Sequence, residues 1–69
     1  MRFGQRVKGL RKSRGWSQED LAERAGLHVT YISGVETGSR NPRLEIVARF
    51  ADTFSLTLPD LLRFEDEDQ

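Results

Sequence analysis

Apolar residues recur along the chain at intervals of three and four residues, which is the spacing of one face of an α-helix. Near the N-terminus this spacing joins Phe3, Val7 and Leu10, and most of the residues between them are polar or basic. Residues 2–13 are therefore predicted to form a basic amphipathic helix that stops before Gly15.

The next apolar positions, at Leu21 and Ala25, are framed by signals for the start and the end of a helix. Ser17 is a preferred N-cap residue, and Asp20 stands three residues later, where the acid of a capping box belongs. Gly26 occupies the place of a C-terminal glycine that takes a positive φ. These signals predict a second helix between Ser17 and Gly26.

Residues 28–38, HVTYISGVETG, have the composition of a β-strand, because β-branched and aromatic residues dominate. Their spacing contradicts a strand, since strict alternation fails and Ile32 and Val35 share a helical face with Leu27. We therefore interpret the segment as a helix capped at His28. Its helix propensity is low, so it is expected to depend on neighbouring helices for stability.

A fourth helix is predicted from about Pro42, with Asn41 or Arg43 as its cap, to about Thr53. Its apolar positions follow helical spacing and are Leu44, Val47, Phe50, Ala51 and Phe54.

A short fifth helix is expected after the cap residue Thr57, with Asp60 at the third helical position and Leu61 and Leu62 directed inwards. The pattern as a whole predicts an all-α fold of five helices, in which residues 1–64 form one domain and residues 65–69 an acidic, disordered tail.

The composition excludes several classes of function. The chain of 69 residues contains no cysteine and one histidine, so disulfides and a histidine or thiolate metal site are not expected. No nucleophile–base set, phosphate loop or carboxylate pair in a plausible pocket is found, so we expect neither an enzyme nor a cofactor. No apolar run approaches the roughly 20 residues of a membrane span, and no signal peptide is recognised, which favours a cytoplasmic protein. No small-molecule effector is evident either.

The formal net charge of zero hides a segregation of charges. Residues 1–14 carry six positive side chains and no acid, whereas residues 65–69, EDEDQ, carry four acids. Without that tail, eleven basic residues face seven acidic ones. A basic body with an acidic tail is typical of a domain that binds polyanions, although an ordinary solvated surface explains the same charges.

The second and third predicted helices, joined by a short turn at Gly26, have the spacing of a DNA-binding helix-turn-helix. Small Ala22 lets the two helices approach, and Gly26 supplies the positive φ of the turn. Ile32 and Val35 are placed to lock the third helix onto the second.

These residues carry a resemblance to a known family. The run WSQEDLAERAGLHVTYISGVETGSRNPRLE, followed by an apolar helix and LTLPDLL, closely resembles the Cro/phage-repressor-type (XRE) helix-turn-helix regulators. The resemblance covers roughly residues 4–63. It implies a compact five-helix lambda-repressor-like domain, and a homodimer that binds a pseudo-palindromic operator in double-stranded DNA with the third helix in the major groove.

The resemblance also implies which residues contact DNA. The positions that face the groove in the family correspond to His28, Val29, Thr30, Ser33 and Gly34. The positions that contact phosphate, or lie beside those contacts, correspond to Ser17, Gln18, Arg40, Asn41 and Arg43. Tyr31 lies beside the groove-facing positions and is a further candidate, because its hydroxyl could hydrogen-bond a phosphate. Alternatives remain for several of these residues: Ser17 and Gln18 as simple caps, Tyr31 as a packing residue, and Arg40 and Arg43 as solvated side chains.

The groove-facing surface departs from the usual chemistry of base recognition. Between His28 and Gly34 there is no Arg, Lys, Asn or Gln, the residue types that make bidentate contacts to guanine or adenine. We therefore expect modest direct readout by this helix. Gly34 is interpreted either as a site where the backbone approaches the groove closely or as a tolerated small residue.

Two further sets of residues are assigned structural roles. Arg11 and Glu36 match a partly buried salt bridge in phage repressors. An apolar surface for a second copy of the chain or for another protein is predicted near the C-terminus, at Leu58, Leu61, Leu62 and Phe64.

The leading hypothesis is a transcriptional regulator, such as an autoregulated repressor or the controller of a restriction–modification operon. The alternative is an antitoxin-like or other protein-interaction module built on the same scaffold.

Overall fold

Five α-helices make up the computed structural model, which describes residues 3–63. Their bounds are α1 Phe3–Ser13, α2 Gln18–Ala25, α3 Val29–Thr37, α4 Leu44–Phe54 and α5 Leu58–Leu61. The predicted all-α class and the predicted order of helices are confirmed. The predicted acidic tail, residues 65–69, and the last residue of the predicted domain lie outside the described residues.

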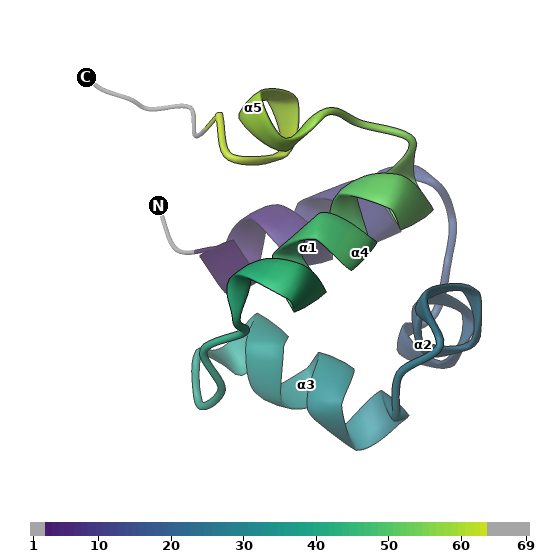
Figure 1. Cartoon of the computed structure of the whole chain (residues 1–69). Coiled ribbons are helices and arrows are strands. Elements are labelled where there is room, and N and C mark those ends of the chain that lie inside the picture. Colours follow the sequence, from purple (N-terminus) through teal and green to yellow (C-terminus); the bar gives the residue numbers. More distant parts are fainter. Residues whose placement is uncertain (1–2, 64–69) are drawn as a thin grey trace.

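The five helices pack around one core (Figure 1). Helix α3, which the resemblance places in the major groove, packs against both α1 and α2. Helix α4 packs against α1, α2 and the short α5. In Figure 1, α5 lies on the opposite side of α1 and α4 from α3. One face of α3 is consequently left uncovered.

Every helix contributes at least one fully buried apolar side chain to the core. The largest of these side chains are Phe50, Phe54, Leu21, Ile32, Leu61, Val7 and Val35. Burial of a side chain of this size stabilises a fold by about 1.5–3 kcal/mol. The ring of Trp16 stacks on that of Phe54, with 5.8 Å between ring centroids, so Trp16 closes the core at the start of α2.

The predicted capping box at the start of α2 is present. The backbone N–H of Asp20 donates to Ser17 Oγ at 2.9 Å, and the backbone N–H of Ser17 donates to Asp20 Oδ2 at 3.0 Å. Hydrogen bonds from the backbone and side chain of Ser17 lower the pKa of the Asp20 carboxyl below its usual range. At the other end of α2, Gly26 has a φ of 70°, as predicted for a left-handed cap.

The strand-like segment is helical, as its spacing predicted. His28 is the N-cap residue, although its side chain makes no capping hydrogen bond, and Gly38 ends α3 with a φ of 87°. Because Ile32 and Val35 are buried in the core, tertiary packing outweighs the low helix propensity of the segment.

Two apolar positions of the helical pattern are exposed, and the predicted inward direction of Leu62 is wrong. Leu44 is 70% exposed because it is the first residue of α4, at the margin of the face that carries Phe50 and Phe54. Leu62 is 44% exposed because α5 ends at Leu61, so helical spacing does not extend to the next residue.

Two arginines of the basic N-terminal segment cap the C-terminal ends of other helices. Arg6 donates to the carbonyl oxygens of Asp60 and Leu61 at 2.7 and 3.0 Å. Arg14 donates to the carbonyl oxygen of Phe54 at 2.8 Å. These carbonyls belong to the last turns of α4 and α5, where cationic donors suit the negative end of a helix dipole. Sequence reasoning missed both contacts, and the six N-terminal positive charges are therefore not one free polyanion-binding surface.

Candidate nucleic-acid interface

The turn between α2 and α3 holds the two helices in a fixed relation. The backbone N–H of Leu27 donates to the carbonyl oxygen of Ala22 at 2.9 Å, which completes the glycine cap of α2. On α3, His28, Val29 and Thr30 are exposed at the N-terminal end, while Ile32 is fully buried one turn later. The start of α3 is thus presented to solvent by a helix whose opposite face is anchored.

A close approach of α1 to α3 sets the position of α3 from the other side. A Cβ atom placed on Gly4 would overlap the carbonyl oxygen of Val35, so only glycine allows the observed distance between the two backbones. Sequence reasoning missed this contact. Nothing in the local sequence separates Gly4 from Gly9 of the same helix, which has open space around it.

The ion pair between Arg11 and Glu36, which the resemblance implies, is present and buried. Arg11 Nε donates to Glu36 Oε2 at 2.7 Å and Arg11 Nη2 donates to Glu36 Oε1 at 3.0 Å, with side chains only 9% and 2% exposed. The hydrogen bond to Glu36 is the main reason why the pKa of the Arg11 guanidinium is raised, and burial acts in the opposite direction. The pair ties α1 to the end of α3.

Gln18 lies at the first position of α2 and joins this network. Its side-chain amide Nε2 donates to Glu36 Oε1 at 3.1 Å, so one carboxylate connects α1, α2 and α3. An amide has two N–H donors, and the second is not used in a hydrogen bond within the described residues 3–63. Ser17 Oγ accepts the backbone N–H of Asp20 in the capping box, and its own O–H remains a donor at this end of α2, together with the first backbone N–H groups of the helix.

The segment after α3 folds back onto the helix. The carbonyl oxygen of Gly34 accepts hydrogen bonds from the backbone N–H groups of Ser39 at 2.9 Å and Arg40 at 3.1 Å. A Cβ atom on Gly34 would lie 2.5 Å from Arg40 Cγ. The stem of Arg40 therefore fills the space beside Gly34 on this face of α3.

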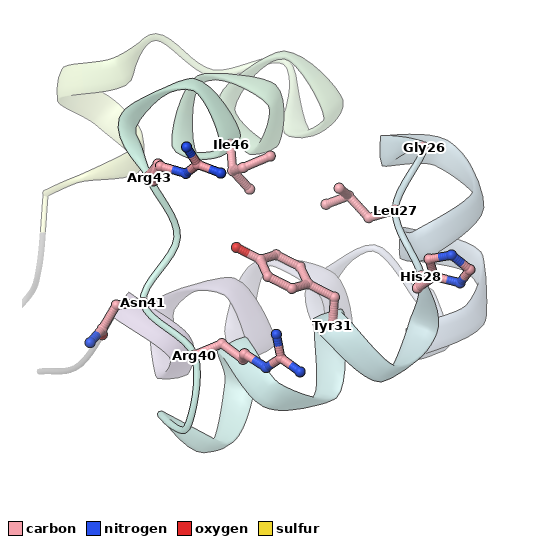
Figure 2. Close-up of a pocket in the computed structure, with 8 residues that line it drawn as sticks. All are labelled: Gly26, Leu27, His28, Tyr31, Arg40, Asn41, Arg43 and Ile46. Atoms are coloured by element: carbon pink, nitrogen blue, oxygen red, sulfur yellow. The ribbon is translucent and has the colours of Figure 1, made fainter.

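A hollow of about 440 Å³ separates the start of α3 from the start of α4. Figure 2 shows its residues: Gly26, Leu27, His28, Tyr31, Arg40, Asn41, Arg43 and Ile46. Four predicted phosphate contacts, Tyr31, Arg40, Asn41 and Arg43, are therefore brought together around it. The Arg40 guanidinium lies 5.9 Å from the centre of the Tyr31 ring, a distance typical of a cation–π contact.

The predicted dimer surface is smaller than expected. Leu61 is fully buried in the core of its own chain, so it is not available to a second copy, and its inclusion is corrected. Leu58 is half-buried and Leu62 exposed, while Phe64 lies outside the described residues.

Within residues 3–63, no helix is long and apolar enough to cross a membrane. The same part of the chain holds no group of three or more His, Cys, Asp or Glu side chains placed to bind a metal ion.

Known proteins with similar sequences include helix-turn-helix regulators. A helix-turn-helix family model matches residues 7–61. The chain is 41% identical over 63 residues to the control protein C.BamHI of Bacillus amyloliquefaciens, with 90% of this chain and 78% of that protein covered. It is 39% identical over 62 residues to the transcriptional regulator DdrOP3 of Deinococcus deserti, where 90% of this chain spans only 48% of the relative.

The fold of the chain is also similar to solved structures of transcriptional regulators. The restriction-modification controller protein C.AhdI from Aeromonas hydrophila superposes with a TM-score of 0.82 at 40% identity, over 87% of this chain and 91% of that one. The biofilm master regulator SinR, in a crystal structure with DNA, gives a TM-score of 0.80 at 32% identity, over 88% and 98% of the two chains.

Proposed function

The chain belongs to the helix-turn-helix family of DNA-binding transcriptional regulators, and from this premise we propose that it binds a pseudo-palindromic operator as a homodimer. In each half-site the N-terminal part of α3 enters the major groove. Two-fold symmetry of such a dimer places the half-site centres about 34 Å apart, one turn of B-DNA.

The observation that carries this proposal is the contrast between the two faces of α3. Its inner face is held by the core, by the Arg11–Glu36 pair and by the close contact with Gly4. Its outer face carries exposed Val29 and Thr30. A rigid helix with a free face is the element that major-groove readers present to bases, and Val29 and the Thr30 methyl suit thymine methyl groups. His28 and Ser33 supply further polar groups for the same surface.

Phosphate contacts are proposed at both ends of this surface. At the start of α2, backbone N–H groups, the spare N–H of Gln18 and the positive end of the helix dipole favour an anion. Across the hollow, Asn41, Arg43 and the hydroxyl of Tyr31 provide a second set of donors. Such contacts position a protein on the duplex without reading its sequence.

The regulatory role is proposed from the relatives. C.BamHI is described as a control protein and C.AhdI as a restriction-modification controller, and both are covered over most of their length. We infer that this chain is a controller of this kind or an autoregulated repressor.

Selection of bound sequences from random duplex DNA, with the mass of the complex measured in the same buffer, tests the proposal. The expected result is a two-fold symmetric sequence bound by two protomers. If no sequence is enriched and the protein instead retains a protein partner from a mixture, the scaffold serves protein interaction and the proposed function is wrong.

A further inference from the structure

Gly34 lies one helical turn after exposed Thr30, on the outer face of α3. The resemblance places this position on the groove-facing surface, and as a glycine it carries no side chain there. The space is nevertheless filled, because the Cβ and Cγ atoms of Arg40 lie 3.5 and 2.5 Å from where a Gly34 Cβ would be. A side chain from the following loop thus occupies the place of the missing helical one.

The backbone of Arg40 is held in this place by hydrogen bonds, and its side chain contacts Tyr31. Its N–H and that of Ser39 donate to the Gly34 carbonyl oxygen, and the Ser39 hydroxyl donates to the same oxygen at 3.3 Å. Figure 2 shows the side chain running along α3, with the guanidinium beside the ring of Tyr31. Within residues 3–63 the guanidinium makes no hydrogen bond, so its five N–H donors remain available to a ligand.

Arg43 provides a natural comparison, because it has the same charge and belongs to the same connecting segment. It is the N-cap residue of α4, and Figure 2 shows it beside Ile46 on the other side of the hollow. The Arg43 side chain is therefore not part of the outer face of α3, whereas the Arg40 side chain lies on that face.

We propose that Arg40 is the base-reading arginine of this protein and that it selects a guanine in each half-site of the operator. The proposal rests on the proposed function and deepens it. Arginine binds the O6 and N7 atoms of guanine through two parallel hydrogen bonds, the contact that no side chain between His28 and Gly34 provides. A residue expected from the sequence to contact phosphate is thereby assigned to sequence readout, with Gly34 and Tyr31 as its positioning residues.

The test compares the wild type with Arg40→Ala and Arg43→Ala. Sequences are first selected with the wild type, and affinities are then measured at fixed salt for the selected operator and for operators in which each guanine is replaced. For the wild type, replacing one guanine per half-site should weaken binding at least about fivefold. For Arg40→Ala, the same replacement should have little effect. Arg43→Ala should weaken binding to all operators by a similar factor.

Gly34→Ala displaces the stem of Arg40 without changing any charge, so it should reduce the preference for the same guanine. Circular dichroism establishes that each variant is folded, and Arg40→Ala, an exposed change, decides the question if Gly34→Ala unfolds. Equal weakening of all operators by Arg40→Ala, with the guanine preference kept, would show that Arg40 contacts phosphate only and overturn the proposal. The proposed function would survive that result, whereas the absence of any selected operator would overturn both.

Discussion

Glu36 accepts hydrogen bonds from two helices while it belongs to a third. Its carboxylate receives three donors, two from Arg11 and one from Gln18, and its side chain is almost completely buried. The resemblance to phage repressors was enough to suggest the pair of Arg11 with Glu36. The hydrogen bond from Gln18 was not predictable from the sequence, because it depends on how the start of α2 lies against the end of α3.

Substitution of Glu36 by alanine should destabilise the protein by about 3–5 kcal/mol, because the buried guanidinium of Arg11 is left without a partner. Urea denaturation, followed by circular dichroism, measures the change. Glu23→Ala removes an exposed carboxylate of α2 and should alter the free energy of unfolding by less than about 0.5 kcal/mol. A loss below about 1 kcal/mol in Glu36→Ala would contradict a structural role for the pair.

Two glycines of α1 should respond in opposite ways to the same substitution. Gly9→Ala should stabilise the protein by about 0.5–1 kcal/mol, because Gly9 has open space around it and alanine favours a helix. Gly4→Ala should destabilise it, because the added methyl group meets the backbone of Val35. Thermal unfolding of both variants measures the difference. Similar melting temperatures for the two would show that α1 and α3 do not approach as described.

Helix boundaries were largely predictable, because the signals that set them are local. Ser17 and Gly26 mark the ends of α2, and helical spacing outweighed composition in α3. The exposure of Leu44 and Leu62 was not predictable in the same way, since a residue at the end of a helix is buried only if another element covers it. The capping role of Arg6 escaped prediction because its acceptors lie 54 and 55 positions away.

The capping box of α2 should make stability depend on acid. The folded state holds the pKa of Asp20 below its unfolded value, so its contribution is present above the unfolded pKa and is lost as the pH falls through the folded one. Below about pH 5, the wild type should therefore lose stability more steeply than Asp20→Asn. Urea denaturation at several pH values compares the two slopes. Parallel curves would mean that folding does not lower the pKa of Asp20.

For the molecule as a whole, the placement of charge matters more than its sum. Three of the N-terminal arginines, Arg6, Arg11 and Arg14, are used inside the domain, although the sequence alone favoured a polyanion-binding surface or a solvated one. Two other cations, Arg40 and Arg43, follow α3 along the chain and line the hollow beside it. Helical spacing predicted the all-α class, but only packing decides which charges face outwards.

Binding to DNA should weaken steeply with salt. If a dimer neutralises on the order of six to ten phosphates, the logarithm of the binding constant should fall against the logarithm of salt concentration with a slope near −5 to −9. Fluorescence anisotropy between about 50 and 200 mM salt measures this slope. Lys8→Ala, an exposed change on α1, should leave it unchanged. A flat response in the wild type would argue against DNA as the ligand.

The capping of α5 by Arg6 has a mechanical consequence. The same helix, α1, donates hydrogen bonds from Arg6 to the C-terminal carbonyl groups of α5 and contacts the backbone of α3 at Gly4. If the proposed homodimer forms through α5, these contacts hold its two α3 helices at a nearly fixed distance and orientation. One base pair inserted at the centre of the operator separates the two half-sites by a further distance of about 3.4 Å and also rotates one half-site around the duplex axis. The protein would therefore select the spacing of the half-sites as well as their sequence.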